Sequence, residues 1–193
     1  YTFATSTGAV LVPGTVDIGN HTDDGTTTIT LPFAYTLYDQ SFTSATIGSN
    51  GVVAFGTADN AFTNTCLPST IATYELLPLW DDQITAPAGK GVFTSVSGTA
   101  PNRIFNIEFR TCGYNGPTTC LAGSDSNYEV RLYEGQSRFD FVYAVTGLTG
   151  STGTVGVQKN SSAFTQFSCN TASLSPGLMI TGTLPACVTG TPA

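Results

Sequence analysis

The stretch NYEVRLYEGQSRFDFVY, residues 127–143, decides the fold class. Its polar middle, residues 134–137, is a turn segment in which Gly135 can adopt a positive φ. On both sides of the turn an apolar side chain recurs at every second position, which gives one apolar face made of Tyr128, Val130, Leu132, Phe139, Phe141 and Tyr143. This period of two around a glycine-containing turn predicts a β-hairpin of two antiparallel strands.

The same alternation recurs elsewhere in the chain. Residues 26–38, TTTITLPFAYTLY, form a predicted strand, and Pro32 within it indicates an edge strand or a bulge. The Asn50-Gly51 pair predicts a type I′ hairpin turn. The apolar face of the predicted strand carries Ile29, Leu31, Phe33, Tyr35 and Leu37.

No segment shows a 3.6-residue period of helical length, and short strands follow one another at regular spacing. We therefore predict an all-β fold, an antiparallel, jelly-roll-like β-sandwich without substantial helix. Residues 1–193 are expected to form a single extracellular domain, with residues 184–193 as a flexible tail.

Charge excludes several kinds of partner. Only 10% of the residues are charged, and 13 Asp and Glu against 6 Lys and Arg give a net charge of −7. Without a basic stripe we expect no nucleic-acid partner. No apolar run approaches the ~18–20 residues that span a bilayer, so we expect no membrane insertion. The chain opens at Tyr1 without an initiator Met, which suggests a mature, processed or excised form.

Five cysteines occur without a zinc-binding spacing, which predicts disulfide bonds formed in an oxidising, extracellular compartment. Cys112 and Cys120 flank a short predicted hairpin tip, where a disulfide would contribute about 2–3 kcal/mol in the chain-entropy model. The odd number leaves one thiol that is either free or paired between molecules. The residues alone leave open how Cys66, Cys169 and Cys187 are used.

Acidic residues provide the only candidate metal ligands. Asp17, Asp23 and Asp24 could bind calcium, although their spacing matches no EF-hand loop and Asx-turns would explain the same residues. Apart from this calcium ion we expect no cofactor. Asp81 and Asp82 follow Trp80, and neighbouring strand residues point to opposite faces. We expect the tryptophan to fill the core and both aspartates to cap a turn or to bind backbone amides.

No catalytic constellation is apparent. Glu108 and Glu129 lie on the polar faces of predicted strands and are expected to be exposed, which argues against a glycosidase pair in a cleft. His21 is the only histidine, and no Ser or Cys stands in a nucleophile-elbow context. We expect no catalytic residues and no enzymatic activity.

Two further surface features are candidates for binding and modification. Tyr38, Tyr114 and Tyr133 fall at turns or outward positions and could stack on sugar rings, although most aromatic residues of an all-β protein pack in the core or across strands. Asn20 and Asn160 stand in Asn-x-Ser/Thr patterns in predicted loops and are candidate glycosylation sites.

Residues 23–56 contain LPF and then SNG followed by FG, residues 77–83 read LPLWDDQ, and residues 127–143 contain YEVRLYEG. These three stretches resemble a β-domain that is common in secreted and cell-surface proteins of bacteria. The chain is also similar, more distantly, to the nidogen-type extracellular domain. The resemblance implies an extracellular β-sandwich module without an assigned catalytic site.

The resemblance also implies a disulfide pairing. Cysteine pairs recur in the resembling domains at the places of Cys66 and Cys169, which implies a bond between them. Cys187 would then be the thiol available for an intermolecular bond. The rival pairing joins Cys169 to Cys187.

We expect a non-catalytic structural or adhesive subunit at the cell surface, able to self-assemble into filaments through β-strand addition. Its partners would be further copies of itself, or another surface protein or glycan. The alternative is a carbohydrate-binding accessory module of a secreted hydrolase, which requires an aromatic platform.

Overall fold

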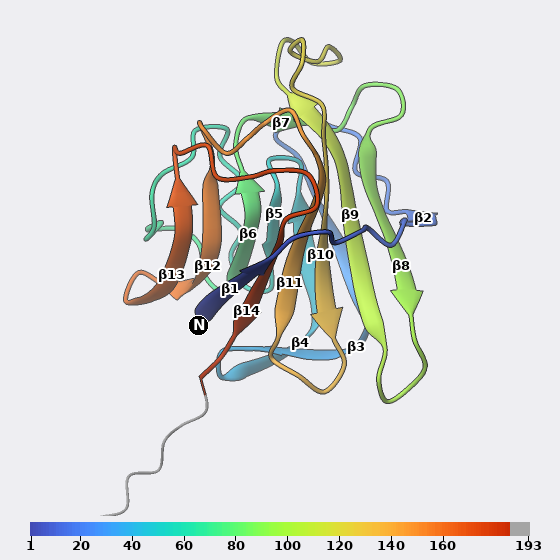
Figure 1. The fold of residues 1–193 in the computed structure, drawn as a ribbon, viewed down its shortest axis with the longest axis vertical. Helices are drawn as coiled ribbons and strands as arrows, with labels where there is room; N and C mark the ends of the chain where they lie inside the picture. Colours follow the sequence, from blue (N-terminus) through green and yellow to red (C-terminus); the bar gives the residue numbers. More distant parts are fainter. Residues whose placement is uncertain (186–193) are drawn as a thin grey trace, which may run out of the picture.

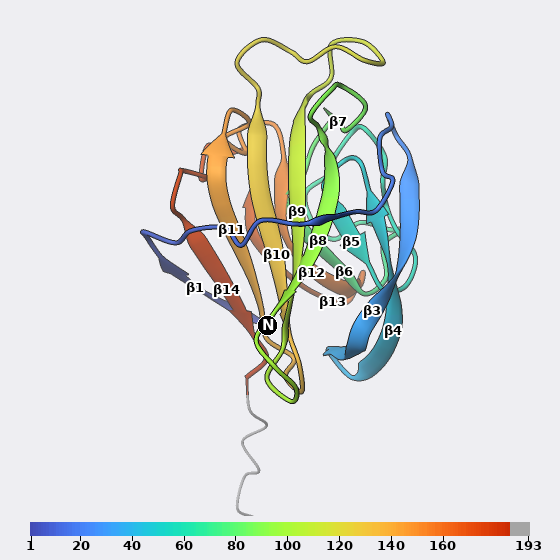
Figure 2. The ribbon, with the colours of Figure 1, turned by 90° about the vertical axis from the view of Figure 1, so that its right-hand side faces the viewer.

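The computed structural model describes residues 1–185, and their strands form two antiparallel sheets packed face to face (Figure 1, Figure 2). The eight-stranded sheet has the order β1 (Thr2–Ser6), β14 (Met179–Thr183), β11 (Phe139–Thr146), β10 (Ser126–Tyr133), β9 (Ile104–Gly113), β8 (Gly91–Ser97) and β2 (Val16–Asp17), with β7 (Gln83–Ile84) also pairing with β9. The six-stranded sheet has the order β13 (Ala163–Cys169), β12 (Thr154–Asn160), β6 (Glu75–Trp80), β5 (Val52–Ala54), β4 (Gln40–Gly48) and β3 (Thr26–Leu37).

The predicted all-β sandwich is confirmed for these residues. None of them belongs to a helix long and apolar enough to cross a membrane. Of the tail predicted at residues 184–193, residues 186–193 lie outside the described residues, and Cys187 is among them.

The hairpin of residues 127–143 forms as predicted and supplies the centre of the core. In the pairing of β10 with β11, Tyr128 lies opposite Tyr143, Val130 opposite Phe141 and Leu132 opposite Phe139. All six side chains are fully buried between the sheets. Gly135, in the connecting turn, has a φ of 71°. Because buried aromatic side chains remove the largest apolar areas from water, this hairpin dominates the core.

The strand predicted at residues 26–38 is β3, and its apolar face also points inward as expected. β3 is the edge strand of the six-stranded sheet, and its register with β4 shifts between Thr30 and Tyr35. The shift surrounds Pro32, whose ring nitrogen cannot donate to a ladder. The strand is therefore both an edge strand and an irregular one, as Pro32 indicated.

A long loop covers the outer face of the six-stranded sheet. Residues 55–74 lie against β6, β12 and β13, and Leu67 from this loop packs with Val52, Leu77 and Trp80 in a second, smaller core. A disulfide bond between Cys66 and Cys169 ties the loop to β13. This is the pairing that the resemblance implied.

The outer face of the eight-stranded sheet is covered by residues 1–18, which we call the arm. Figure 2 shows the arm running across β11, β10, β9 and β8, from β1 at one edge to β2 at the other. Glu108 and Glu129 lie beneath it, only 4% and 0% exposed. The expectation that these two side chains are exposed is therefore wrong, because a segment distant in sequence covers the polar face.

Truncation of the core hairpin should test this packing. We expect Phe141→Ala to lower the free energy of unfolding by about 3–5 kcal/mol, because it leaves a cavity where a fully buried ring packs between the sheets. The matched control on the same strand is Val145→Ala, which removes an exposed side chain and should change stability by less than about 0.5 kcal/mol. Urea denaturation measures both, and similar losses in the two variants would contradict the assigned faces.

Candidate functional site

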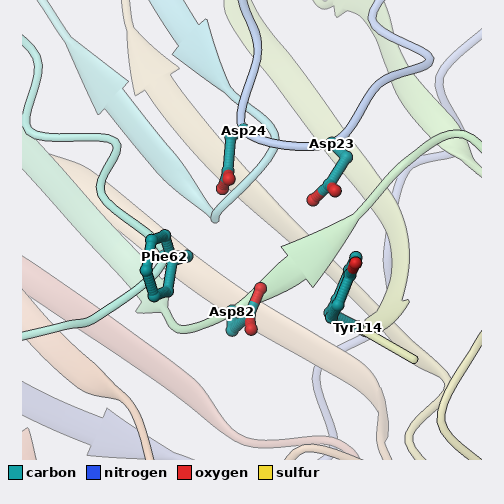
Figure 3. Close-up of a pocket in the computed structure, with 5 residues that line it drawn as sticks. All are labelled: Asp23, Asp24, Phe62, Asp82 and Tyr114. Carbon is teal, nitrogen blue, oxygen red and sulfur yellow. The ribbon is translucent and has the colours of Figure 1, made fainter. Parts of the chain in front are cut away.

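Three loops that are distant in sequence meet at one end of the sandwich. They contain Asp23 and Asp24 before β3, the turn at residues 49–51 between β4 and β5, and Asp82 between β6 and β7. Figure 3 shows the carboxylates of Asp23 and Asp24 pointing toward Asp82, with the rings of Phe62 and Tyr114 beside them. These five residues line a pocket of about 250 Å³.

The buried side chain of Asn50 connects the three loops. Its Nδ2 donates to Asp24 Oδ1 at 2.7 Å, and its Oδ1 accepts a hydrogen bond from the backbone N–H of Gln83 at 3.0 Å. Its backbone carbonyl accepts from the N–H of Asp81 at 3.3 Å. An amide can donate and accept at once, so one side chain fixes the loop on each side of the pocket.

The turn that carries Asn50 differs from the predicted type. A type I′ turn needs a positive φ at both central residues, and only Gly51 has one, at 77°. A Cβ atom on this glycine would lie 2.0 Å from the carbonyl oxygen of Leu79. The glycine is thus required by its conformation and by the close approach of β6, and the hairpin forms with another turn geometry.

The carboxylates of Asp23, Asp24 and Asp82 have oxygens within 4.8 Å of one another. Burial raises the pKa of Asp82, and the negative charges of Asp24, Asp23 and Asp81 raise it further. Burial also raises the pKa of Asp23, with a smaller contribution from the charge of Asp24. The cluster therefore carries mutual repulsion that a bound cation would relieve.

No basic side chain neutralises the cluster. Each of the 6 Lys and Arg residues forms an ion pair with a carboxylate elsewhere, namely that of Asp39, Glu108, Asp125, Glu129, Glu134 or Asp140. The unneutralised negative charge of the described surface is thus concentrated at this pocket.

The neighbouring acidic residue, Asp81, has a structural role. Its Oδ1 accepts a hydrogen bond from the N–H of Asp82, and its Oδ2 accepts one from the hydroxyl of Thr152 at 2.8 Å. Trp80 is buried, and its Nε1 donates to the carbonyl of Ala61. The expectation of a core tryptophan followed by a turn-capping aspartate is confirmed for Asp81, whereas Asp82 points into the pocket.

The two aromatic residues of the pocket are unusually exposed. Phe62 is 58% exposed on the loop of residues 55–74, and Tyr114 is 42% exposed. Tyr114 belongs to the tip that the predicted Cys112–Cys120 disulfide closes, and its N–H donates to the carbonyl of Asp82 at 3.1 Å. The sequence points to Tyr114 as an outward aromatic residue but gives no signal for Phe62, because nothing in the local pattern brings their two loops together.

Asp17 does not join the pocket. The candidate calcium set of Asp17, Asp23 and Asp24 is corrected to one in which Asp82 takes the third place. Asp17 Oδ2 instead pairs with His21 Nε2 at 2.8 Å, and its Oδ1 accepts from the N–H of Gly19. Calcium prefers six to eight oxygen ligands, so calcium binding here stays a prediction.

Two of the three tyrosines predicted as sugar platforms, Tyr38 and Tyr133, are engaged within the protein. The ring of Tyr38 packs edge-on against Tyr1 at 4.8 Å. The hydroxyl of Tyr133 donates to Asp140, and the guanidinium of Arg138 lies over its ring at 4.5 Å. Neither tyrosine lines the pocket, so an aromatic platform would have to be sought elsewhere.

The two candidate glycosylation sites differ in access. Asn20 is fully buried, and its side chain contacts the carbonyl of Ile47 and the hydroxyl of Thr85, so the folded protein cannot accept a glycan there. This corrects its placement in an open loop. Asn160 lies at the turn between β12 and β13, where its Oδ1 accepts from the N–H of Ser162. Asn160 therefore remains a candidate glycosylation site.

A second carboxylate feature lies beneath the loop of residues 55–74. Glu75 is fully buried, and its Oε1 accepts from the N–H of Asp59 at 3.0 Å. Its Oε2 has no partner among the described residues. Burial raises the pKa of Glu75 well above its usual value, with a contribution from the charge of Asp59. Glu75 anchors the loop through the hydrogen bond that its Oε1 accepts from Asp59.

Comparison with known proteins gives one family. The family described as "NIDO related" matches residues 1–188. No curated protein and no solved structure matches the chain.

Neutralising Asp82 should stabilise the protein. Its carboxylate accepts no hydrogen bond from the described residues, so Asp82→Asn removes repulsion without removing a contact. We expect a gain of about 0.3–1 kcal/mol at pH 7, or about 1–3 °C in Tm. The raised pKa of Asp82 means that the wild type loses stability as the pH rises from about 4 through the folded-state value, and this loss should be smaller in the variant.

The matched control is Asp39→Asn. The Asp39 carboxylate is exposed and pairs with Lys159 at 2.7 Å, and the hydrogen bond from Lys159 lowers its pKa, so the sign of its pH dependence is opposite. Calorimetric melts between pH 3.5 and 7 in the presence of EDTA, which removes any bound cation, compare the variants, and a lower Tm for Asp82→Asn under these conditions would contradict the repulsion. Comparing wild-type melts with and without EDTA tests the calcium prediction, because removal of a bound ion would lower the Tm.

Proposed function

The chain belongs to the NIDO-related family, and we propose that it is a non-catalytic structural or adhesive subunit of an extracellular surface. The match supports a distantly nidogen-like domain. From the motifs LPF, SNG and WDD we further propose that this domain is of the kind carried by secreted and cell-surface proteins of bacteria.

An extracellular location is supported by the covalent structure. The disulfide bond Cys112–Cys120 closes a short loop, and Cys66–Cys169 ties the loop of residues 55–74 to β13; such bonds persist in oxidising compartments. Both hold loops that contribute an aromatic residue to the pocket. In a secreted domain these two bonds would hold the loops of the pocket in place.

The observation that carries the proposal is the pocket itself. Recognition residues of β-sandwiches commonly stand on loops at one end of a rigid scaffold. Here three carboxylates without a basic partner and two exposed rings occupy such an end, fixed by Asn50. This is a surface suited to holding a polar or cationic ligand group rather than to transforming it.

The same geometry favours one alternative, a carbohydrate-binding accessory module of a secreted hydrolase. Carboxylates accept hydrogen bonds from sugar hydroxyls, and aromatic rings pack on sugar faces. Phe62 and Tyr114 provide exposed rings beside Asp23, Asp24 and Asp82. The platform proposed for this alternative is therefore the pocket, and Tyr38 and Tyr133 take no part in it.

We also propose that copies of the chain assemble into filaments. Edge strands present unpaired backbone groups that can accept a strand from a neighbour. In the six-stranded sheet β3 and β13 are edge strands, and in the eight-stranded sheet the edges are β1 and β2. Cys187, outside the described residues, is the proposed intermolecular thiol.

Electron microscopy of the purified native chain tests the structural function. We expect filaments at micromolar concentrations or above. Because reductant would also break the two intramolecular disulfides, Cys187→Ser is the matched control for any loss of filaments on reduction. Loss of filaments in this variant would show that the Cys187 thiol is needed for assembly. Monomers in every preparation of the wild type would contradict self-assembly and leave ligand binding as the function to test.

A further inference from the structure

The arm, residues 1–18, supplies both edge strands of the eight-stranded sheet. β1 extends the sheet beyond β14 over five paired positions, from Thr2 opposite Thr183 to Ser6 opposite Met179. β2 pairs with β8 at the opposite edge. Without the arm, the edge groups of β14 and β8 would lose their backbone partners.

Between the two edges, carboxylates of the sheet hold the backbone of the arm. Glu129 of β10 and Glu108 of β9 lie directly opposite each other on the outer face. Each accepts a hydrogen bond at 2.8 Å from a backbone N–H of the arm, Glu129 from Val12 and Glu108 from Gly14. Buried carboxylates that accept backbone N–H groups are strong, charge-assisted partners.

Two arginines complete this recognition by donating to carbonyl groups of the arm. Arg131 donates to the carbonyl of Val10 at 2.6 Å, and Arg110 donates to the carbonyl of Gly14 at 3.2 Å. Each arginine also pairs with the glutamate two residues before it on its own strand. Side chains on the outer face of the sheet therefore bind the main chain of the arm at Val10, Val12 and Gly14, which are alternate residues.

Aromatic side chains anchor the beginning of the arm. The ring of Tyr1 lies 4.8 Å from Tyr38 and 5.2 Å from Phe139. The ring of Phe3 lies 5.9 Å from Phe167 of β13. These rings close the side of the sandwich between β14 and β13. Such anchors give a peptide segment most of its affinity for an acceptor surface.

A hinge separates the arm from the body. Gly19 has a φ of 79° and open space where a Cβ atom would stand. The next residue, Asn20, is fully buried and held by Ile47 and Thr85. The fixed body therefore begins one residue after a glycine that can absorb a change in direction.

The arm is held less tightly than the rest of the sandwich. None of residues 4–13 is fully buried. Apart from Tyr1, Phe3 and Ile18, which pack against the core, the arm buries little apolar surface, so its detachment costs less free energy than global unfolding. An extended segment of this length spans roughly 60 Å, far more than the radius of a domain of this size.

We propose that the arm of one copy is received by the eight-stranded sheet of a second copy, where it replaces that copy's own arm in the same register. The proposal rests on the proposed self-assembling function and names its interface. The acceptor consists of the β14 edge, the Glu–Arg pairs of β9 and β10, the β8 edge, and the rings that contact Tyr1 and Phe3. Within one copy, each of these parts already binds the sequence of the arm.

The direction of exchange follows from where the arm is attached. Its hinge adjoins β2 and β8 at one edge of the sheet, and its beginning lies at β14 on the other. A copy that gives its arm to one neighbour leaves its own acceptor open for another. Such a head-to-tail contact extends into a filament unless it closes into a ring.

An introduced pair of cysteines distinguishes an arm that binds the sheet of a second copy from an arm that binds its own sheet. The hydroxyls of Thr2 and Thr183 lie 3.3 Å apart, both exposed. Thr2→Cys is placed in one full-length chain and Thr183→Cys in a second, each also carrying Cys187→Ser. The two purified native proteins, which differ in tag, are mixed, incubated and mildly oxidised, and mixed dimers are counted on non-reducing gels. The matched control replaces Thr183→Cys by Thr28→Cys, an exposed position on β3.

We expect at least a tenfold excess of mixed dimer for the Thr2–Thr183 combination over the Thr2–Thr28 control. A single chain with both Thr2→Cys and Thr183→Cys should form the bond within a monomer, which shows that the geometry permits it. A mixed yield equal to the control, with the bond formed in that monomer, would overturn the proposal.

Filament imaging of the wild type separates this inference from the proposed function. Filaments without the mixed bond would overturn arm exchange but keep self-assembly through another surface. The mixed bond without filaments would support arm exchange in closed dimers and contradict the polymer. Absence of both would overturn the inference and the self-assembling function together.

Discussion

The buried amide of Asn50 is the constraint on which the pocket at the end of the sandwich depends. It ties Asp24 to the connection between β6 and β7, and so places Asp82 opposite Asp24. An aspartate at this position could not donate to Asp24 and would add a fourth negative charge to the pocket. The neutral amide holds acidic loops together in a place where a charged side chain would separate them.

Ion pairs determine how charge is distributed over the rest of the molecule. The 6 Lys and Arg side chains are all engaged in ion pairs, three of them with carboxylates that are almost fully buried on the outer face of the eight-stranded sheet. Buried ion pairs are costly unless further hydrogen bonds satisfy them. The arm supplies such bonds to Glu108 and Glu129, so the charged face and its covering segment need each other. Among the exposed and half-buried carboxylates of the described residues, those without a basic partner lie at the pocket.

Local periodicity predicted the parts of the fold that local physics decides. The hairpin around Gly135 and the inward face of β3 follow from alternation alone, because one register buries every apolar side chain and a shift by one residue exposes them all. The predictions failed where a distant segment intervenes. Glu108 and Glu129 are on the predicted face, yet the arm covers them, and Asn20 lies in a loop that the body buries.

The site was predicted only in part for the same reason. Asp23 and Asp24 follow from their own loop, whereas the sequence assigns both Asp81 and Asp82 to turn capping, because neighbouring strand residues point to opposite faces and only the structure shows that Asp82 faces the pocket. Which of two adjacent aspartates faces a pocket depends on where the strand ends, and that is fixed by Asn50 through tertiary contacts. The exposed rings of Phe62 and Tyr114 likewise belong to loops that disulfide bonds position.

The central claim is that the body is a rigid module whose eight-stranded sheet is closed by a separable arm. Native-state hydrogen exchange measures this directly at the amides of Val12 and Gly14, compared with Val130 and Phe141 in the core hairpin. The account predicts that the arm amides exchange together through a partial opening with a free energy well below that of global unfolding. Equal protection of the arm and the hairpin would show that the arm opens only when the whole sandwich unfolds, and would contradict the account.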